Sequence, residues 1–119
     1  MKKENSGYVV SISATLASQP SASVPALTAV LSKSSPPAAS KALALEYAWH
    51  NIRFNTVSPG IINTPIHADG HHDLLAKFHP LARVGEISDI VGAMLYLQEA
   101  TFVTGENIHL DGGAHAGRP

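Results

Sequence analysis

Residues Ile52–Pro65 read Ile-Arg-Phe-Asn-Thr-Val-Ser-Pro-Gly-Ile-Ile-Asn-Thr-Pro, and this stretch decides the fold. Its first half is rich in β-branched and aromatic residues, which favour a strand, and Pro59-Gly60 ends that strand abruptly. Thr64 places a hydroxyl group just beyond the end. In open parallel sheets ligands bind beyond the carboxyl ends of the strands, so this is a candidate binding segment. An ordinary strand-to-loop turn is the alternative.

The composition is that of one small globular domain. The chain has 119 residues, of which 45% are hydrophobic and 14% charged, enough to bury a modest core. A formal net charge of -1 without a basic run argues against nucleic-acid binding. The absence of cysteine excludes disulfides and thiolate metal sites.

The sequence also bears on membranes and location. No apolar run approaches the roughly 20 residues that span a bilayer. Met1-Lys2-Lys3 leads into polar residues rather than into the apolar core of a signal peptide. We therefore expect a cytoplasmic protein without membrane contact.

The first half of the chain predicts one strand and one long helix. Tyr8–Ser13 is a β-branched run that predicts a buried strand of a parallel sheet. Residues 25–33 have helical composition, but Ser34-Ser35-Pro36-Pro37 interrupts them. Because proline suits the first helical turn, we expect an N-cap at Ser35 and a helix from Pro36 to about Trp49 or His50. This helix is apolar on more than one face, which predicts burial on both sides.

The second half predicts one more helix and one more strand. Residues 66–79 are polar and rich in histidine, without a clear period. Apolar residues at helical spacing then predict a helix from about Ser88 to Glu99, and Asn107–Leu110 predicts a short strand. The order strand, helix, strand, helix, strand is typical of α/β proteins with right-handed crossovers and a parallel sheet.

A series of short motifs follows the chain in a characteristic order. They are the strand ending Ser-Ile-Ser13, Ser32-Lys33, Leu43-Ala-Leu-Glu46, Asn51-Ile-Arg-Phe-Asn55, Ser58-Pro-Gly60, Thr64-Pro65, Leu81-Ala-Arg83 with Gly85, Val103-Thr-Gly105 and Leu110-Asp-Gly-Gly113. Each motif is weak alone. In this order and spacing they resemble the C-terminal half of a short-chain dehydrogenase/reductase, from about residue 6 to residue 113.

The resemblance implies a Rossmann-like parallel sheet that binds NAD(P). It implies an oxidoreductase that moves hydride between nicotinamide and a carbonyl, alcohol or activated double bond of a small-molecule substrate. The last strand of the family often supports subunit contacts, which implies a homo-oligomer. The residues that the resemblance places beside the nicotinamide are Pro59, Gly60, Ile62 and Thr64.

The resemblance also implies catalytic residues, and here the chain departs from the family. The family's catalytic lysine falls on Lys33, but the tyrosine expected four residues earlier is Ala29. The serine that holds the substrate oxygen falls near Ala14, so Ser13 or Thr15 is the substitute, and we choose Ser13. Prolines 36 and 37 predict that Lys33 lies in a loop or before a kink.

A larger departure is the absence of a glycine-rich phosphate loop after a strand. We therefore expect residues 1–119 to form a partial domain that lacks the glycine-rich half, with Met1 matching an internal methionine of longer relatives. As this chain alone, the oxidoreductase is then expected to be impaired. The alternative function is a noncatalytic remnant or interaction module that keeps the subunit-facing half of the fold.

Other polar residues have simpler interpretations. Residues 67–73 contain three histidines besides two aspartates, and a mobile polar loop is favoured there over a metal site, so we predict no metal. Arg83, Glu86 and Asp89 are expected to form a structural ion-pair cluster at a helix start. Asn55 is expected to pin the backbone, and His109 to be a satisfied residue of the sheet.

Overall fold

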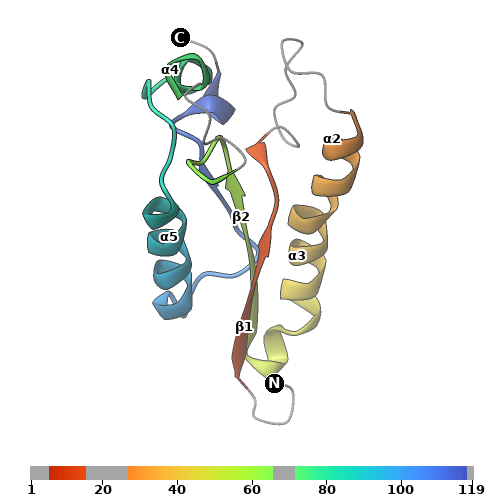
Figure 1. The fold of residues 1–119 in the computed structure, drawn as a ribbon. Helices are drawn as coiled ribbons and strands as arrows, with labels where there is room; N and C mark the ends of the chain where they lie inside the picture. The colour runs from red at the N-terminus through yellow and green to blue at the C-terminus, as the bar shows by residue number, and fades with distance from the viewer. Residues whose placement is uncertain (1–5, 16–26, 66–71, 118–119) are drawn as a thin grey trace.

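The computed structural model of the chain describes residues 6–15, 27–65 and 72–117. A parallel sheet lies between two helical layers (Figure 1). The strands are β1 (Gly7–Ile12), β2 (Ile52–Pro59) and β3 (Asn107–Leu110), and the other elements are α2 (Leu27–Lys33), α3 (Ser35–Glu46), η2 (Ala48–His50), α4 (His72–Leu75), η4 (Ala76–Phe78), α5 (Ile87–Glu99) and η5 (Ala114–Ala116). Helices α2 and α3 cover one face of the sheet and α5 covers the other. The predicted α/β fold is confirmed.

β2 is the middle strand and carries the core. The sheet order is β1-β2-β3, with Val57 opposite Ile12 on one side and Ile108 on the other. Val57 is fully buried, and so are the polar residues Thr56 and Ser58 that flank it. The prediction that this stretch organises the chain is therefore confirmed.

The buried hydroxyl groups of β2 are bonded to neighbouring elements. Thr56 Oγ1 donates to Ser40 Oγ of α3 at 3.0 Å, and Ser58 Oγ donates to Asn107 Oδ1 of β3 at 2.7 Å. Within the described ranges, no buried side-chain nitrogen or oxygen lacks a partner. Because an unpaired buried polar group costs about 1–3 kcal/mol, these bonds favour one register of the sheet and one position of α3.

Asn55 pins the backbone as predicted. Its side chain is 1% exposed, and its Nδ2 donates to Val103 O at 3.0 Å. Its Oδ1 accepts a hydrogen bond from Glu106 N at 3.0 Å. One amide side chain thus holds the turn that leads into β3.

β1 is less buried than predicted. It spans Gly7–Ile12 and pairs with β2 alone among the described strands, so it lies at the edge of the sheet. Tyr8 and Ile12 are both exposed. The expectation of a buried strand was wrong because burial depends on neighbouring elements that the local pattern does not reveal.

The junction between α2 and α3 is smoother than predicted. α3 begins at Ser35, and its N-cap is Ser34 rather than Ser35. Ser34 has helical backbone angles, and its N–H donates to Val30 O at 3.0 Å. Pro36-Pro37 occupies the first turn of α3, where a missing N–H costs little. Lys33 is therefore the last residue of α2 rather than part of a loop, and it directly precedes the bend at Ser34 between the two helices, which agrees with the second predicted alternative.

α3 also ends earlier than predicted and is buried on one side only. It ends at Glu46, and η2 follows as a separate turn. The residues buried in α3 are Ser40 and Ala44, which lie one turn apart on the face toward the sheet. On other faces Leu45 is 81% exposed, and Trp49 of η2 is 96% exposed. The expected burial on both sides is wrong for the described part of the chain.

α5 begins one residue before the predicted start and ends at Glu99 as predicted. Glu86 and Asp89 form a capping box at its N-terminus, in which Glu86 N donates to Asp89 Oδ2 at 2.8 Å. No helix in ranges 6–15, 27–65 and 72–117 has the length and apolarity required to cross a bilayer.

The C-terminal end of α5 is bonded to β2 through Arg53. Its Nη2 donates to Gln98 O at 2.9 Å, and its Nη1 donates to Ala100 O at 3.0 Å. A guanidinium group satisfies helix carbonyls that have no intrahelical donor and complements the negative end of the helix dipole. The strand therefore caps the helix that packs on it.

We predict that Asn55→Ala lowers the free energy of unfolding by about 2–3 kcal/mol, because the buried amide of Asn55 is lost and Val103 O and Glu106 N lose their partner at partly buried positions. Urea denaturation measures the change. Asn63→Ala is the control, since among the described residues that side-chain amide bonds only the surface carboxylate of Glu86, at 3.3 Å, and it should cost less than about 0.5 kcal/mol. Equal losses in the two variants would contradict the pinning role.

Candidate functional site

The segment after β2 follows a path fixed by close contacts. Gly60 N donates to Leu110 O at 2.9 Å, and a methyl group on Gly60 would lie 2.9 Å from Asp111 Cβ. Further on, Ile61 O accepts from Gly85 N at 2.8 Å, and Gly85 O accepts from Asn63 N at 2.8 Å. Glycine is required at position 60 because there is no room for a side chain.

The predicted nicotinamide-side residues lie along this path. Pro59, Gly60, Ile62 and Thr64 are all half-buried, and the backbone of Ile62 forms a bridge with Gly85. The structure thus keeps these four residues on one ordered segment at the carboxyl end of β2. That is the edge of a parallel sheet at which ligands bind.

Ser13 links the backbone of Lys33 by a hydrogen bond to the carboxyl edge of the sheet, where segment 59–64 begins. Its N–H donates to Val57 O of β2 at 2.8 Å, and its hydroxyl donates to the backbone carbonyl of Lys33. In an uninterrupted helix that carbonyl would accept from the N–H of residue 37, but Pro37 has none. The missing helical donor explains why the hydroxyl of Ser13 can take its place.

The side chains of the two residues differ in access. Ser13 is buried, whereas Lys33 is exposed at the end of α2. Position 29, where the resemblance expects tyrosine, lies one turn earlier in the same helix. The backbone that a tyrosine-lysine pair requires is therefore present in α2.

Sequence reasoning missed a cluster centred on Asp111, which is buried just after β3. Its carboxylate accepts from Thr15 Oγ1 at 2.6 Å, from Gly113 N at 3.0 Å, and from both N and Nδ1 of His115. Thr15, the alternative to Ser13, is thus bonded to Asp111. The signal that could have found this cluster is Asp-Gly-Gly, because aspartate commonly bonds the N–H two residues later.

The environment of Asp111 lowers the pKa of its carboxyl group. Burial acts to raise the pKa, but the hydrogen bonds from Thr15, His115 and Gly113 outweigh it. This contribution to stability is present above the pKa of the carboxyl group in the unfolded chain. It is lost as the pH falls through the lower pKa of the folded state.

Two histidines stack beside this cluster. The rings of His109 and His115 lie 4.0 Å apart at 15°, so His109 is a packed residue of the sheet, as expected. Burial lowers the pKa of His109, the charge of His115 lowers it further, and the charge of Asp111 opposes both. A pocket of about 300 Å³ is lined by His109, His115 and residues of the adjoining turns.

A third histidine, His79, also went unnoticed in the sequence. It is buried, and its Nε2 accepts from Ile61 N at 3.0 Å. Its Nδ1 lies 2.6 Å from Arg83 O. No local pattern marks this residue, because Ile61, the partner of its Nε2, lies 18 residues earlier in the chain.

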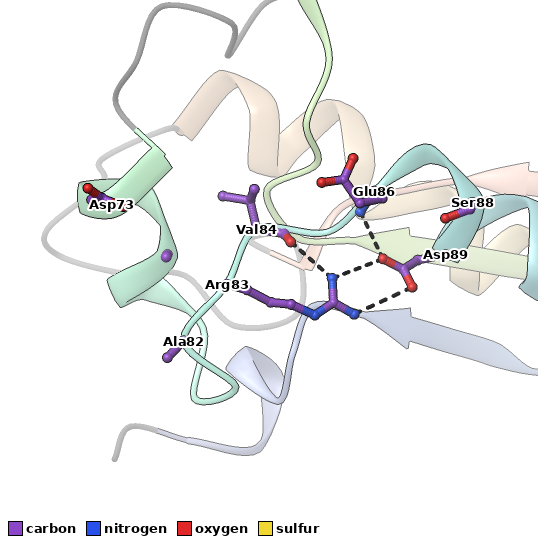
Figure 2. Close-up of a pocket in the computed structure, with 8 residues that line it drawn as sticks. Asp73, Ala82, Arg83, Val84, Glu86, Ser88 and Asp89 are labelled. Carbon is purple, nitrogen blue, oxygen red and sulfur yellow. Dashed lines mark hydrogen bonds and ion pairs between the residues drawn. The ribbon is translucent and has the colours of Figure 1, made fainter.

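Figure 2 shows the predicted ion-pair cluster in a pocket of about 490 Å³. Arg83 Nη1 lies 3.1 Å from Asp89 Oδ2, and this hydrogen bond lowers the pKa of Asp89 and raises that of Arg83. Asp73 lines the far side of the pocket from α4, away from this pair. The cluster closes the N-terminus of α5, so the structural interpretation is confirmed.

The histidine-rich segment is only partly described. Its residues 66–71 lie outside the described residues, including His67, Asp69 and His71. Among the residues the structure does describe, no group of three or more histidine and carboxylate side chains is arranged to hold a metal ion.

These residues fit the nicotinamide side of a dinucleotide. An ordered glycine-containing backbone segment and an exposed lysine lie at the carboxyl edge of a parallel sheet. Lys33, Gly60, Ile62 and Thr64 would hold that side of NAD(P). The glycine-rich loop that binds the pyrophosphate does not occur in the sequence.

Comparison with known proteins decides the family. A family model described as enoyl-(acyl carrier protein) reductase matches residues 1–115. The chain belongs to the short-chain dehydrogenase/reductase family. Among its relatives, carbonyl reductase family member 4 of Xenopus laevis is 43% identical over 74 residues, which are 62% of this chain and 31% of that protein.

Solved structures of other short-chain dehydrogenase/reductases have the same fold. ElxO with NADP bound superposes with a TM-score of 0.90 at 25% identity, over 98% of this chain and 50% of its own. A short-chain type dehydrogenase/reductase from Mycobacterium ulcerans gives 0.87 at 29% identity, over 99% and 45%. The predicted Rossmann-like architecture is confirmed, and the chain spans about half the length of these neighbours.

We predict that the chain loses stability as the pH falls from 7.5 to 5.5, in part through His109. Because its folded pKa lies below the unfolded value near 6.5, the unfolded chain binds more protons in this range. His109→Gln should reduce the loss by less than about 1 kcal/mol, since the ring is partly screened by solvent. Urea denaturation tests this, with pH 7.5 to 8.5 as the control range. If the free energies of unfolding of the unmodified chain and of His109→Gln change equally with pH from 5.5 to 8.5, His109 does not contribute to the loss of stability.

Proposed function

We propose that this chain forms part of an NAD(P)-dependent oxidoreductase that transfers hydride between nicotinamide and a carbonyl, alcohol or activated double bond. The observation that carries the proposal is the ordered segment 59–64 at the carboxyl edge of β2, with Lys33 attached to the same edge through Ser13. Family membership and the NADP bound to ElxO support the choice of cofactor.

Lys33 is the proposed cofactor-binding and catalytic cation. When bound, NAD(P) supplies the hydride donor or acceptor. The ammonium group of Lys33 would hydrogen-bond the nicotinamide ribose, and its exposed position at the end of α2 leaves it available for this bond. Segment 59–64 would orient the nicotinamide through its backbone, because Gly60 carries no side chain that would block approach.

Ser13 is proposed as the hydroxyl that supports the substrate side of the site. Its oxygen has two lone pairs, so it can accept a hydrogen bond from an alcohol while it donates to the carbonyl of Lys33. This arrangement would couple substrate binding to the position of Lys33. Ser13 thereby acts on the cofactor side as well.

Proton transfer is the weak point of the proposed site. In the family a tyrosine four residues before the lysine supplies the proton, and this chain has Ala29. Loss of a positioned acid typically costs about 10² to 10⁴ in rate. We therefore propose that the chain binds the cofactor but reduces carbonyl groups slowly.

A second candidate function is a noncatalytic interaction module. The observation that favours it is the exposure of two large apolar side chains, Leu45 near the end of α3 and Trp49 in η2. Such a surface favours association with a second copy of the chain. A homo-oligomer is compatible with both functions, so cofactor binding separates them.

We predict that the purified chain binds NADPH or NADH saturably and that Lys33→Ala weakens binding about tenfold, through loss of a charged hydrogen bond. Nicotinamide fluorescence measures the affinity, and light scattering on the same sample reports the oligomer. Lys41→Ala removes another exposed lysine, from α3, and should leave the affinity unchanged. Absence of binding in the unmodified chain would reject the enzyme in favour of the interaction module.

We further predict that Ala29→Tyr raises the rate of NADPH-dependent ketone reduction about 10²-fold or more, because it restores a phenol one helical turn from Lys33. Absorbance of NADPH follows the reaction. Ala42→Tyr adds the same side chain to an exposed position of α3 and should leave the rate unchanged. If the Ala29→Tyr variant binds NADPH but reduces the ketone no faster than the unmodified chain, position 29 is not the position of the catalytic tyrosine.

A further inference from the structure

His79 is buried where three segments of the chain meet, with 4% of its surface exposed. Its Nε2 accepts from Ile61 N–H at 3.0 Å, and its Nδ1 lies 2.6 Å from Arg83 O. A backbone N–H can only donate and a carbonyl can only accept. The two bonds therefore require the neutral imidazole with its proton on Nδ1.

Two glycines make room for this ring. A methyl group on Gly60 would lie 2.6 Å from His79 Nε2, and one on Gly112 would lie 2.9 Å from His79 Cβ. Real Cβ atoms essentially never approach so closely. Gly60 therefore leaves room for the ring, and Gly112 leaves room for the Cβ atom that carries it. Gly60 follows β2 and Gly112 follows β3, so the imidazole fills the space between the ends of two strands.

We propose that His79 is a positioning residue for the cofactor site. Its Nε2 holds the N–H of Ile61 and thereby fixes the backbone of residues 60–62, along which the nicotinamide side of NAD(P) binds. The proposal rests on the proposed function, because residues 60–62 are the candidate nicotinamide contacts. His79 acts through Ile61 rather than by touching the cofactor.

The two hydrogen bonds separate positioning from simple packing. If His79 only filled space, another side chain of similar volume could take its place without changing the backbone of residues 60–62. Here one ring nitrogen bonds the candidate segment, and the other bonds the segment that carries Arg83. The two bonds can be broken one at a time, because the amide of asparagine reaches the position of Nδ1 and that of glutamine reaches the position of Nε2.

The test compares His79→Asn with His79→Gln in the full chain. His79→Asn keeps a donor for Arg83 O and removes the acceptor for Ile61 N–H, whereas His79→Gln keeps that acceptor. Hydrogen exchange of the Ile61 amide, followed by NMR, and NADPH affinity are measured for each. His50→Asn, at the opposite end of β2, is the matched control.

We expect His79→Asn to speed exchange of the Ile61 amide and weaken NADPH binding, each about tenfold, from loss of one backbone-holding hydrogen bond. His79→Gln should stay within about threefold of the unmodified chain on both measures, and His50→Asn should not change them. ¹⁵N shifts of the His79 ring should report a proton on Nδ1.

Three results would overturn the proposal. Unchanged Ile61 exchange in His79→Asn would mean that His79 does not hold the segment. Faster exchange with unchanged NADPH affinity would mean that it holds the segment without positioning cofactor. If His79→Asn and His79→Gln lose exchange protection of the Ile61 amide and NADPH affinity equally, His79 only fills space. If the unmodified chain binds no NADPH, the proposed function fails as well, and the exchange data still decide whether His79 fixes residues 60–62.

Discussion

The polar side chains of β2, three of them buried, hold the rest of the structure in place. Asn55 bonds the turn before β3, Thr56 bonds α3, Ser58 bonds β3, and Arg53 caps α5. Apolar burial alone is non-directional and would allow neighbouring elements to slide. Each hydrogen bond instead requires one partner at one distance, because a buried group without a partner is costly. The central strand therefore specifies both helical layers and one neighbouring strand.

Local sequence signals predicted what local physics controls. The β-branched run before Pro59-Gly60 gave the central strand, and apolar spacing gave α5 within one residue. The edge position of β1 was missed because it depends on which strands lie beside it. The Asp111 cluster and the His79 junction were missed because their partners are remote: Thr15 and Asp111 are 96 residues apart, and His79 and Ile61 are 18 apart. Spacing within one element carries no information on such pairs.

Two acidic side chains near the carboxyl edge of the sheet have partners that offset their charge. Asp111 is bonded to His115 and to backbone N–H groups, and Asp89 is paired with Arg83. Acidic groups that are paired in this way repel an anionic ligand less than free carboxylates at the same distance. Lys33 then contributes its positive charge to the same region. This local arrangement of charges cannot be read from the net charge of the chain.

Pro37 determines which group bonds the carbonyl of Lys33, so a mutation at this position can change the hydrogen bond of Ser13. Because Pro37 has no N–H, the carbonyl of Lys33 takes the hydroxyl of Ser13. A single-codon replacement of Pro37 would give that carbonyl a helical donor and release the hydroxyl for another acceptor. The direction of the hydroxyl group of Ser13, just after β1, thus depends on a residue in a different element. Selection could redirect it without altering Ser13 itself.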